Sequence, residues 1–212
     1  MNAMRSVSRA CAAAAMVAAS VSCGNVVRSS RAPVILVIDS LAGLRGAATT
    51  STPASNLVSD VLTNVTTGGT CTTVAPCPTI FGDSGQVTMH LVLKDIGTGT
   101  TTTAPSTNNE VTITRVHVSY RRTDGRNQEG VDVPYAFDTA TTFTVPQQGS
   151  VQGGFPLVRS QAKEQSPLIE LRTNGLVIST IGDVTFYGTD LVGNEVSITG
   201  SINIDFANFG DF

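Results

Sequence analysis

The stretch FYGTDLVGNEVSITGSINIDF, residues 186–206, decides the fold class. From Val196 to Phe206 the apolar side chains share one parity, and polar side chains such as Ser197 and Asn203 take the other. A period of two residues is typical of a strand with one buried and one solvated face, as in an antiparallel sandwich. We therefore predict a strand whose buried face is formed by Val196, Ile198, Ile202, Ile204 and Phe206.

A polar cluster, Asp190, Asn194 and Glu195, precedes this strand and could offer oxygen ligands to calcium. Calcium needs six or more oxygens, and the sequence has no dense array of acidic residues here. Asp and Asn also stabilise turns by bonding to nearby backbone, and Gly193 permits an unusual φ. We interpret the cluster as a turn between two strands, and we predict neither a metal site nor a cofactor.

The same alternation recurs upstream in residues 86–95, and a strong apolar run in residues 33–44 predicts a further strand. In residues 110–120 the apolar parity shifts, which predicts a β-bulge near Arg115. Further strands are expected in residues 131–137, 141–145, 153–158, 175–180 and 183–190. Residues 160–172 are the one segment with helical character; Ser166 can cap a short helix and Pro167 can occupy its first position. Thr-rich loops are expected at residues 45–56, 63–79 and 96–109.

Composition supports an all-β protein and argues against some partners. The chain of 212 residues has 20 Gly, no Trp, 14% charged residues and a net charge of −3. Abundant β-branched and hydroxyl residues with frequent Gly suit short strands joined by turns. The near-neutral net charge gives no electrostatic footprint for nucleic acid, whose binding needs clustered Lys and Arg. The lack of Trp argues against a site that binds carbohydrate by stacking it on aromatic side chains.

The N-terminus has the layout of a secretory signal peptide, with Arg5 and Arg9 before an Ala-rich apolar run and small residues before Cys23. The apolar run is too short to span a bilayer, which takes about 20 residues, and no later segment is longer and more apolar. We predict a signal peptide at residues 1–22, a tether at 23–33 and one domain at 34–212. The mature protein is expected not to be an integral membrane protein.

The segment SVSC, residues 20–23, resembles the lipobox of bacterial lipoproteins. Val21 and Ser22 fit the pattern, whereas Ser20 stands where a large aliphatic residue is usual. The resemblance implies a lipid on Cys23 and anchoring in a membrane, which we expect to be the outer membrane of a Gram-negative bacterium. Cleavage after Ser22 by an ordinary signal peptidase is the alternative, and it would release a soluble periplasmic or extracellular protein.

Cysteine arithmetic agrees with lipidation. Cys11 leaves with the signal peptide and Cys23 takes the lipid, which leaves Cys71 and Cys77 to pair in an oxidising envelope. This disulfide would staple a surface loop.

Residues 176–206 resemble the terminal hairpin of bacterial immunoglobulin-like and fibronectin type III-like domains, in which an A-x-D-x-x-G-N turn links the last two strands. The resemblance implies an antiparallel β-sandwich with long Thr-rich loops and one short helix. The motif is turn chemistry and implies no catalytic residues.

The stretch GDSG, residues 82–85, is similar to the nucleophile segment of chymotrypsin-type serine proteases. That pattern continues with Gly-Pro, where this chain has Gln86 and Val87. In that family the histidine that acts as the catalytic base precedes the serine in the sequence, whereas His90 and His117 follow Ser84. We predict no catalytic residues, and a hydrolase using Ser84 is an alternative.

Four arginines, Arg115, Arg121, Arg122 and Arg126, cluster around one predicted hairpin with Asp124-Gly125 at its tip. They could bind an anionic glycan, phosphate or lipid head group. Glu129 and Asp132 are close enough in sequence to neutralise them, so a solvated tip is the competing interpretation. We expect a non-catalytic binding module with an unknown protein or glycan partner, or alternatively a structural subunit of a surface assembly.

Overall fold

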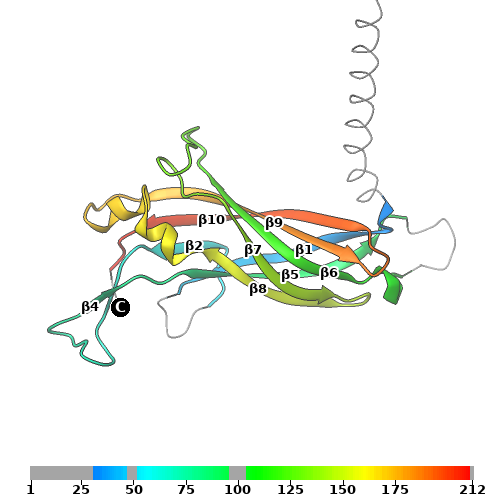
Figure 1. The fold of residues 1–212 in the computed structure, drawn as a ribbon, viewed down its shortest axis with the longest axis horizontal. Helices are drawn as coiled ribbons and strands as arrows, with labels where there is room; N and C mark the ends of the chain where they lie inside the picture. The colour runs from blue at the N-terminus through cyan, green and yellow to red at the C-terminus, as the bar shows by residue number, and fades with distance from the viewer. Residues whose placement is uncertain (1–30, 47–51, 96–103, 211–212) are drawn as a thin grey trace, which may run out of the picture.

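Two packed sheets account for most of the chain that the structure describes, which is residues 31–46, 52–95 and 104–210 of a computed structural model (Figure 1). The strands are β1 (Val34–Leu44), β2 (Asn56–Asp60), β3 (Thr63–Val65), β4 (Cys77–Thr79), β5 (Asp83–Leu93), β6 (Val111–Arg121), β7 (Phe137–Val145), β8 (Ser150–Val158), β9 (Ile178–Asp190) and β10 (Glu195–Ala207). One sheet has the order β1-β5-β8, a second has the order β2-β10-β9-β6-β7, and β3 pairs with β4. The expected all-β class with antiparallel sheets is confirmed, except that β2 runs parallel to β10.

The predicted alternation places the core as expected. In β5, Val87 and Met89 are fully buried and Ser84 is exposed. In β10, four of the five predicted inward residues are buried, and Ile198 packs against the core from a half-buried position. Gly200 interrupts this apolar face, and a Cβ at that position would lie 2.9 Å from Ile38 Cδ1 of β1. Glycine therefore lets β1 approach the middle of β10.

Aromatic side chains join the two sheets. The rings of Phe155 in β8 and Phe186 in β9 meet edge to face with centroids 5.2 Å apart. The hydroxyl of Tyr120 in β6 donates a hydrogen bond of 2.7 Å to the carbonyl oxygen of Leu157 in β8. Burial of this phenol raises its pKa, and the nearby Arg159 partly opposes the shift. These contacts fix how one sheet lies on the other.

The predicted β-bulge is confirmed, because the register of β6 with both of its neighbours shifts between Ile113 and Arg115. As a result Val116 and Val118 return to the core face, while Arg115 and His117 point away from it. The turn at Asp124-Gly125 is also present, with Gly125 at φ +84°. The connection between β6 and β7, residues 122–136, projects from the sandwich (Figure 1).

Several sequence-based expectations differ from the structure. Residues 131–136 form a loop instead of a strand, in which Gly130 N–H and Val133 O are hydrogen-bonded. Residues 160–172 form two short 3-10 helices, η2 (Ser160–Glu164) and η3 (Leu168–Arg172), at the end of the sandwich where β8 leads to β9. Pro167 is the N-cap of η3 rather than its first helical residue. The short strands β2, β3 and β4 were not predicted.

The predicted signal peptide (1–22), Cys23, most of the tether (23–33) and parts of two Thr-rich loops lie outside the described residues. None of the helices in the described part has the length and apolar character needed to cross a bilayer.

Candidate functional site

The arginines on the projecting β6–β7 connection share one carboxylate. Arg122 and Arg126 donate to Asp124, with Nη2–Oδ2 distances of 2.7 Å and 2.8 Å. These hydrogen bonds hold the pKa of Asp124 well below its usual range. Glu129 and Asp132 were the expected neutralising residues; the charge of Asp132 adds a smaller contribution than Asp124 to the raised pKa of Arg126, and Asp132 also accepts a hydrogen bond from the backbone N–H of Gln128. The hairpin tip is thus a structured, ion-paired turn.

The other two arginines of the predicted patch lie on β6 and have separate partners. Arg121 Nε lies 2.6 Å from Asp183 Oδ2, and Arg115 Nη1 lies 3.1 Å from Asp138 Oδ1. The guanidinium of Arg115 also stacks over the ring of Tyr187 at 3.9 Å. Six residues of strand separate Arg115 from Arg121, roughly 20 Å. Arg115 therefore lies apart from Arg121, Arg122 and Arg126, and each of the four arginines has a carboxylate partner.

Burial raises the pKa of Asp183, while hydrogen bonds from Arg121 and Ser201 lower it, and the net result is a lowered pKa. Ser201 Oγ donates to Asp183 Oδ1 at 2.6 Å. This carboxylate is thus held in its charged form on the outer face of the five-stranded sheet.

A polar depression of about 390 Å³ lies beside this ion pair and was not predicted. The strand register places Arg121, Ile181, Asn203 and Asn56 in one row across β6, β9, β10 and β2. The residues that line the depression are Asn56, Thr123, Ser179, Thr180, Ile181, Asn203 and Asp205.

Asp205 is the hydrogen-bonding centre of this depression. Ser179 Oγ donates to Asp205 Oδ1 at 2.5 Å, and Asn56 Nδ2 donates to Asp205 Oδ2 at 3.0 Å. Asn203 is exposed beside them, and Thr123 of the projecting connection forms one wall. The sequence showed Asn203 and Asp205 only as the solvated side of a strand, because β2, which completes the depression, was missed.

In the GDSG stretch, residues 82–85, the acidic residue Asp83 has a structural role. Asp83 is buried, whereas Ser84 is exposed and pairs with Leu44 and Pro156 on neighbouring strands. His90 lies six residues further along β5, roughly 20 Å away, and its Nδ1 is 2.8 Å from Asp39 Oδ1. The arrangement does not place this histidine within reach of the serine hydroxyl.

The second histidine of the hydrolase alternative lies in the other sheet. His117 in β6 has its Nδ1 3.3 Å from Asp138 Oδ2. Its ring faces the outer side of the five-stranded sheet, whereas Ser84 lies in the three-stranded sheet. The geometry therefore gives no support to a nucleophile and base built from Ser84 and either histidine.

Asp83 belongs to a buried polar network that the sequence did not reveal. Its Oδ2 lies 2.7 Å from Lys163 Nζ and accepts a hydrogen bond of 2.6 Å from Ser59 Oγ. The Lys163 ammonium also donates to the carbonyl oxygen of Asp60 at 2.8 Å. Gly46 N–H donates to Asp83 Oδ1 at 2.9 Å. This network ties η2 to β2 and β5, so its role is to hold these elements together.

The cluster Asp190, Asn194 and Glu195 forms the β9–β10 turn. Asp190 Oδ1 accepts hydrogen bonds from the backbone N–H groups of Val192 and Asn194 at 3.0 Å and 2.7 Å. The side-chain amide of Asn194 donates to Asp190 Oδ2 at 2.7 Å, and Gly193 has φ +85°. The turn interpretation is confirmed. Within the described residues, no three His, Cys, Asp or Glu side chains are grouped to hold a metal ion.

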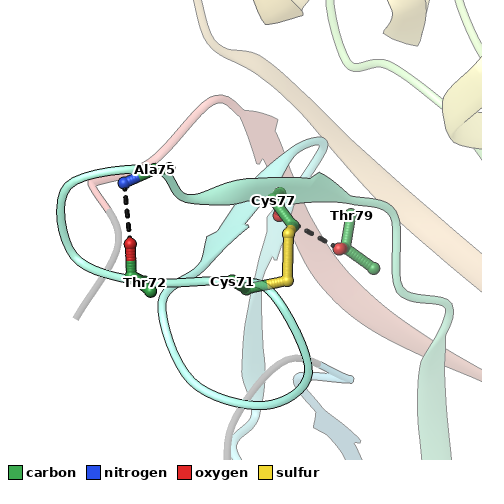
Figure 2. Close-up of a disulfide and its surroundings, with 5 residues drawn as sticks. All are labelled: Cys71, Thr72, Ala75, Cys77 and Thr79. Atoms are coloured by element: carbon green, nitrogen blue, oxygen red, sulfur yellow. Dashed lines mark hydrogen bonds between the residues drawn. A yellow bond between two sulfur atoms is a disulfide. The ribbon is translucent and has the colours of Figure 1, made fainter.

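The predicted disulfide between Cys71 and Cys77 is confirmed, with a Cα–Cα distance of 5.3 Å. Figure 2 shows the small loop that it closes, in which Thr72 Oγ1 accepts a hydrogen bond from Ala75 N–H at 3.0 Å. Thr79 Oγ1 donates to the carbonyl oxygen of Cys77. The loop extends from the two-stranded sheet β3-β4 and leaves the main core untouched.

Comparison of the chain with models of protein families, with curated proteins and with solved structures finds no match.

Proposed function

We propose that this protein is a non-catalytic, exported binding module with an immunoglobulin-like or fibronectin type III-like β-sandwich. A lipid on Cys23 anchors it, in our proposal, in the outer membrane of a Gram-negative bacterium. Its partner is a polar protein or glycan surface in the envelope or outside the cell.

The observation that carries this proposal is the polar depression centred on Asp205. Its volume of about 390 Å³ falls within the range of ligand sites, about 300–1,000 Å³. Its lining combines the apolar side chain of Ile181 with carboxylate, amide and hydroxyl groups, which can accept and donate hydrogen bonds to a hydroxyl-rich or amide-bearing partner. Except for Thr123, these groups stand on paired strands, which position side chains more precisely than loops do.

The projecting hairpin contributes to the same surface. Thr123 forms a wall of the depression, and Arg121 lies in the same cross-strand row as Asn203. Arg126 is exposed at the tip, although it is paired with Asp124. A partner that carries carboxylate or phosphate groups could therefore engage the hairpin while its neutral polar groups occupy the depression.

Photo-crosslinking in the native envelope tests the proposal. A benzoylphenylalanine in place of Asn203 should crosslink to a discrete partner, and protease or glycosidase digestion of the product identifies the partner as protein or glycan. The matched control is Gln152, an exposed residue on the outer face of the three-stranded sheet. Equal crosslinking at both positions, or none at Asn203, would rule out this binding surface.

The anchor is tested separately by intact-mass measurement and membrane fractionation of the native protein. Lipidation predicts a mature N-terminus at Cys23 with added acyl mass, and loss of both the lipid and membrane association in the Cys23→Ser variant. A mature chain that begins after Ser22 without added mass would instead show an ordinary secreted protein.

A structural subunit is the second candidate, and the edges of the sheets favour it. β2 pairs only with Asn203–Ala207 of β10, so the earlier part of β10 has no hydrogen-bonded strand on that side among the described residues, although β1 packs close to its middle at Gly200. A depression of about 270 Å³ separates this part from the edge strand β1 and is lined in part by Val34, Ile35 and Val196. An edge of this kind can accept a further strand.

Self-association of the purified protein decides between the two candidates. A structural subunit should form oligomers whose size grows with concentration, and Ile35→Lys should suppress them because a lysine at an exposed edge opposes strand addition. A wild-type protein that stays monomeric at high concentration contradicts the structural candidate.

A further inference from the structure

The β9–β10 turn lies at the end of the sandwich where the chain enters its first strand. Val34 and Ile35 of β1 line the same depression as Glu195 and Val196 of β10. Figure 1 shows the start of β1 and the turn that follows β9 at one end of the long axis, and η2 and η3 at the other.

Two aliphatic side chains protrude from this turn. Leu191 is 60% exposed and Val192 is 68% exposed. The hydrogen bonds to the Asp190 carboxylate hold the turn in one conformation, so the pair is presented on a rigid support. Tight turns usually carry Gly, Asn, Asp, Ser or Pro at such positions. A contiguous apolar pair on a rigid tip, with no basic residue between Leu191 and Asn194, suits an apolar surface better than an anionic one.

The length of chain before β1 limits what that surface can be. About 11 residues separate Cys23 from Val34, which can span at most about 40 Å. A lipid on Cys23 would therefore keep this end of the sandwich near a bilayer. Two aliphatic side chains are too few for binding from solution, but in a tethered chain the contact is intramolecular and a weak interaction suffices.

We infer that Leu191 and Val192 insert into the interface of the bilayer to which the chain is anchored. This inference rests on the proposed lipid anchor. It orients the sandwich end-on, because β9 carries the chain about 40 Å from the turn to its other end. Asn203, Asp205 and Ser179 lie toward that distal end, so the polar depression faces away from the membrane and toward a partner.

A second exposed aliphatic pair supplies the matched control. Leu176 and Val177, just before β9, are 64% and 54% exposed, and they lie at the opposite end of that strand. They should stay in water when the chain is anchored. The chain has no Trp, so one introduced tryptophan reports on one position alone.

The test compares Val192→Trp with Val177→Trp in the lipidated full chain, reconstituted in phosphatidylcholine vesicles with brominated acyl chains. The tryptophan at position 192 should show a blue-shifted emission that loses most of its intensity to bromine quenching. The tryptophan at position 177 should be unshifted and unquenched. Equal behaviour at both positions, or no quenching at position 192, overturns the inference.

A parallel arm separates this inference from the anchor itself. The unlipidated chain that begins at Cys23 is coupled through that thiol to a maleimide lipid, since Cys71 and Cys77 are joined in a disulfide. Quenching at position 192 in the coupled chain supports the tip contact even if the native protein carries no lipid, and then only the anchor is refuted. No quenching in the coupled chain refutes the tip contact whatever the native mass.

Discussion

Lys163 Nζ lies 2.7 Å from Asp83 Oδ2, and the two side chains are 1% and 3% exposed. The pair links the 3-10 helix η2 to the first residue of β5, across 80 positions of sequence. Since both charges are withdrawn from water, each depends on the other and on its hydrogen bonds to Ser59, Asp60 and Gly46. The pair is therefore a sensitive point for the stability of the fold.

Removing one partner should destabilise the protein strongly. We expect Lys163→Met to lower the free energy of unfolding by about 3–5 kcal/mol, because the Asp83 carboxylate stays buried without its counter-charge. The double variant Lys163→Met/Asp83→Asn should cost less than the sum of the single variants. Denaturant unfolding of the three variants measures this coupling.

Arg115→Gln is the control for the buried pair, since Arg115 and Asp138 form an exposed ion pair. Its cost should be no more than about 1 kcal/mol. If the two changes at the buried pair add within about 0.5 kcal/mol, the coupling between Lys163 and Asp83 is absent.

A side chain at position 85 should destabilise the protein. A Cβ at this position in β5 would collide with the ring of Phe155, which is buried and packed edge to face on Phe186. Gly85→Ala should therefore cost about 1–3 kcal/mol through overpacking. Gly154→Ala is the matched control, because a Cβ at this neighbouring β8 position meets nothing within 4 Å. Thermal unfolding should show a lower Tm for the first variant only; similar values would contradict the packing argument.

The disulfide should act locally. Its ring is small, so loss of Cys71–Cys77 should cost only about 2 kcal/mol of loop-closure entropy. Strands β3 and β4 each have three residues and form a sheet that is marginal without the covalent link. In a Cys71→Ser/Cys77→Ser variant, amide exchange should speed up in residues 63–79 and stay unchanged in β5 and β10. Faster exchange throughout the core would show that the loop supports the whole fold.

The sequence predicted those elements whose patterns are long and one-sided. β10, β5 and the bulge in β6 followed from the parity of residues such as Ile204, Met89 and Val116, because a buried face allows only one register. β2 escaped prediction because it has five residues beside a Thr- and Ser-rich segment, and its parallel pairing with β10 depends on a partner about 150 positions away.

The candidate site was predictable only in part. The turn at Asp190 and the disulfide have local signatures in the sequence. The polar depression does not, because Asn56, Asn203 and Ser179 come together only after three strands pair. Lys163 was equally hidden, since it lies in a polar segment, QAKEQ, where a solvated lysine is the usual outcome. The sequence did not reveal the ion-pair partners of Arg121 and Arg115, because Asp183 and Asp138 come from other strands.

The ion pair between Arg121 and Asp183 should make the stability of the protein depend on pH in the acid range. The folded protein holds the pKa of Asp183 below its usual value, so the unfolded chain takes up this proton first as the pH falls. The stability that the pair contributes is thus complete above the ordinary Asp pKa of about 3.9, and it is lost as the pH falls through the folded pKa. In Arg121→Gln, burial continues to raise the pKa of Asp183 and only Ser201 opposes it, so the pKa should rise.

A carbon-detected NMR titration of the Asp183 carboxyl measures this shift. Arg115→Gln is the control, because its partner is Asp138, and it should leave the Asp183 titration unchanged. An Asp183 titration that is the same in Arg121→Gln as in the wild type would show that the guanidinium does not hold this carboxylate in its charged form.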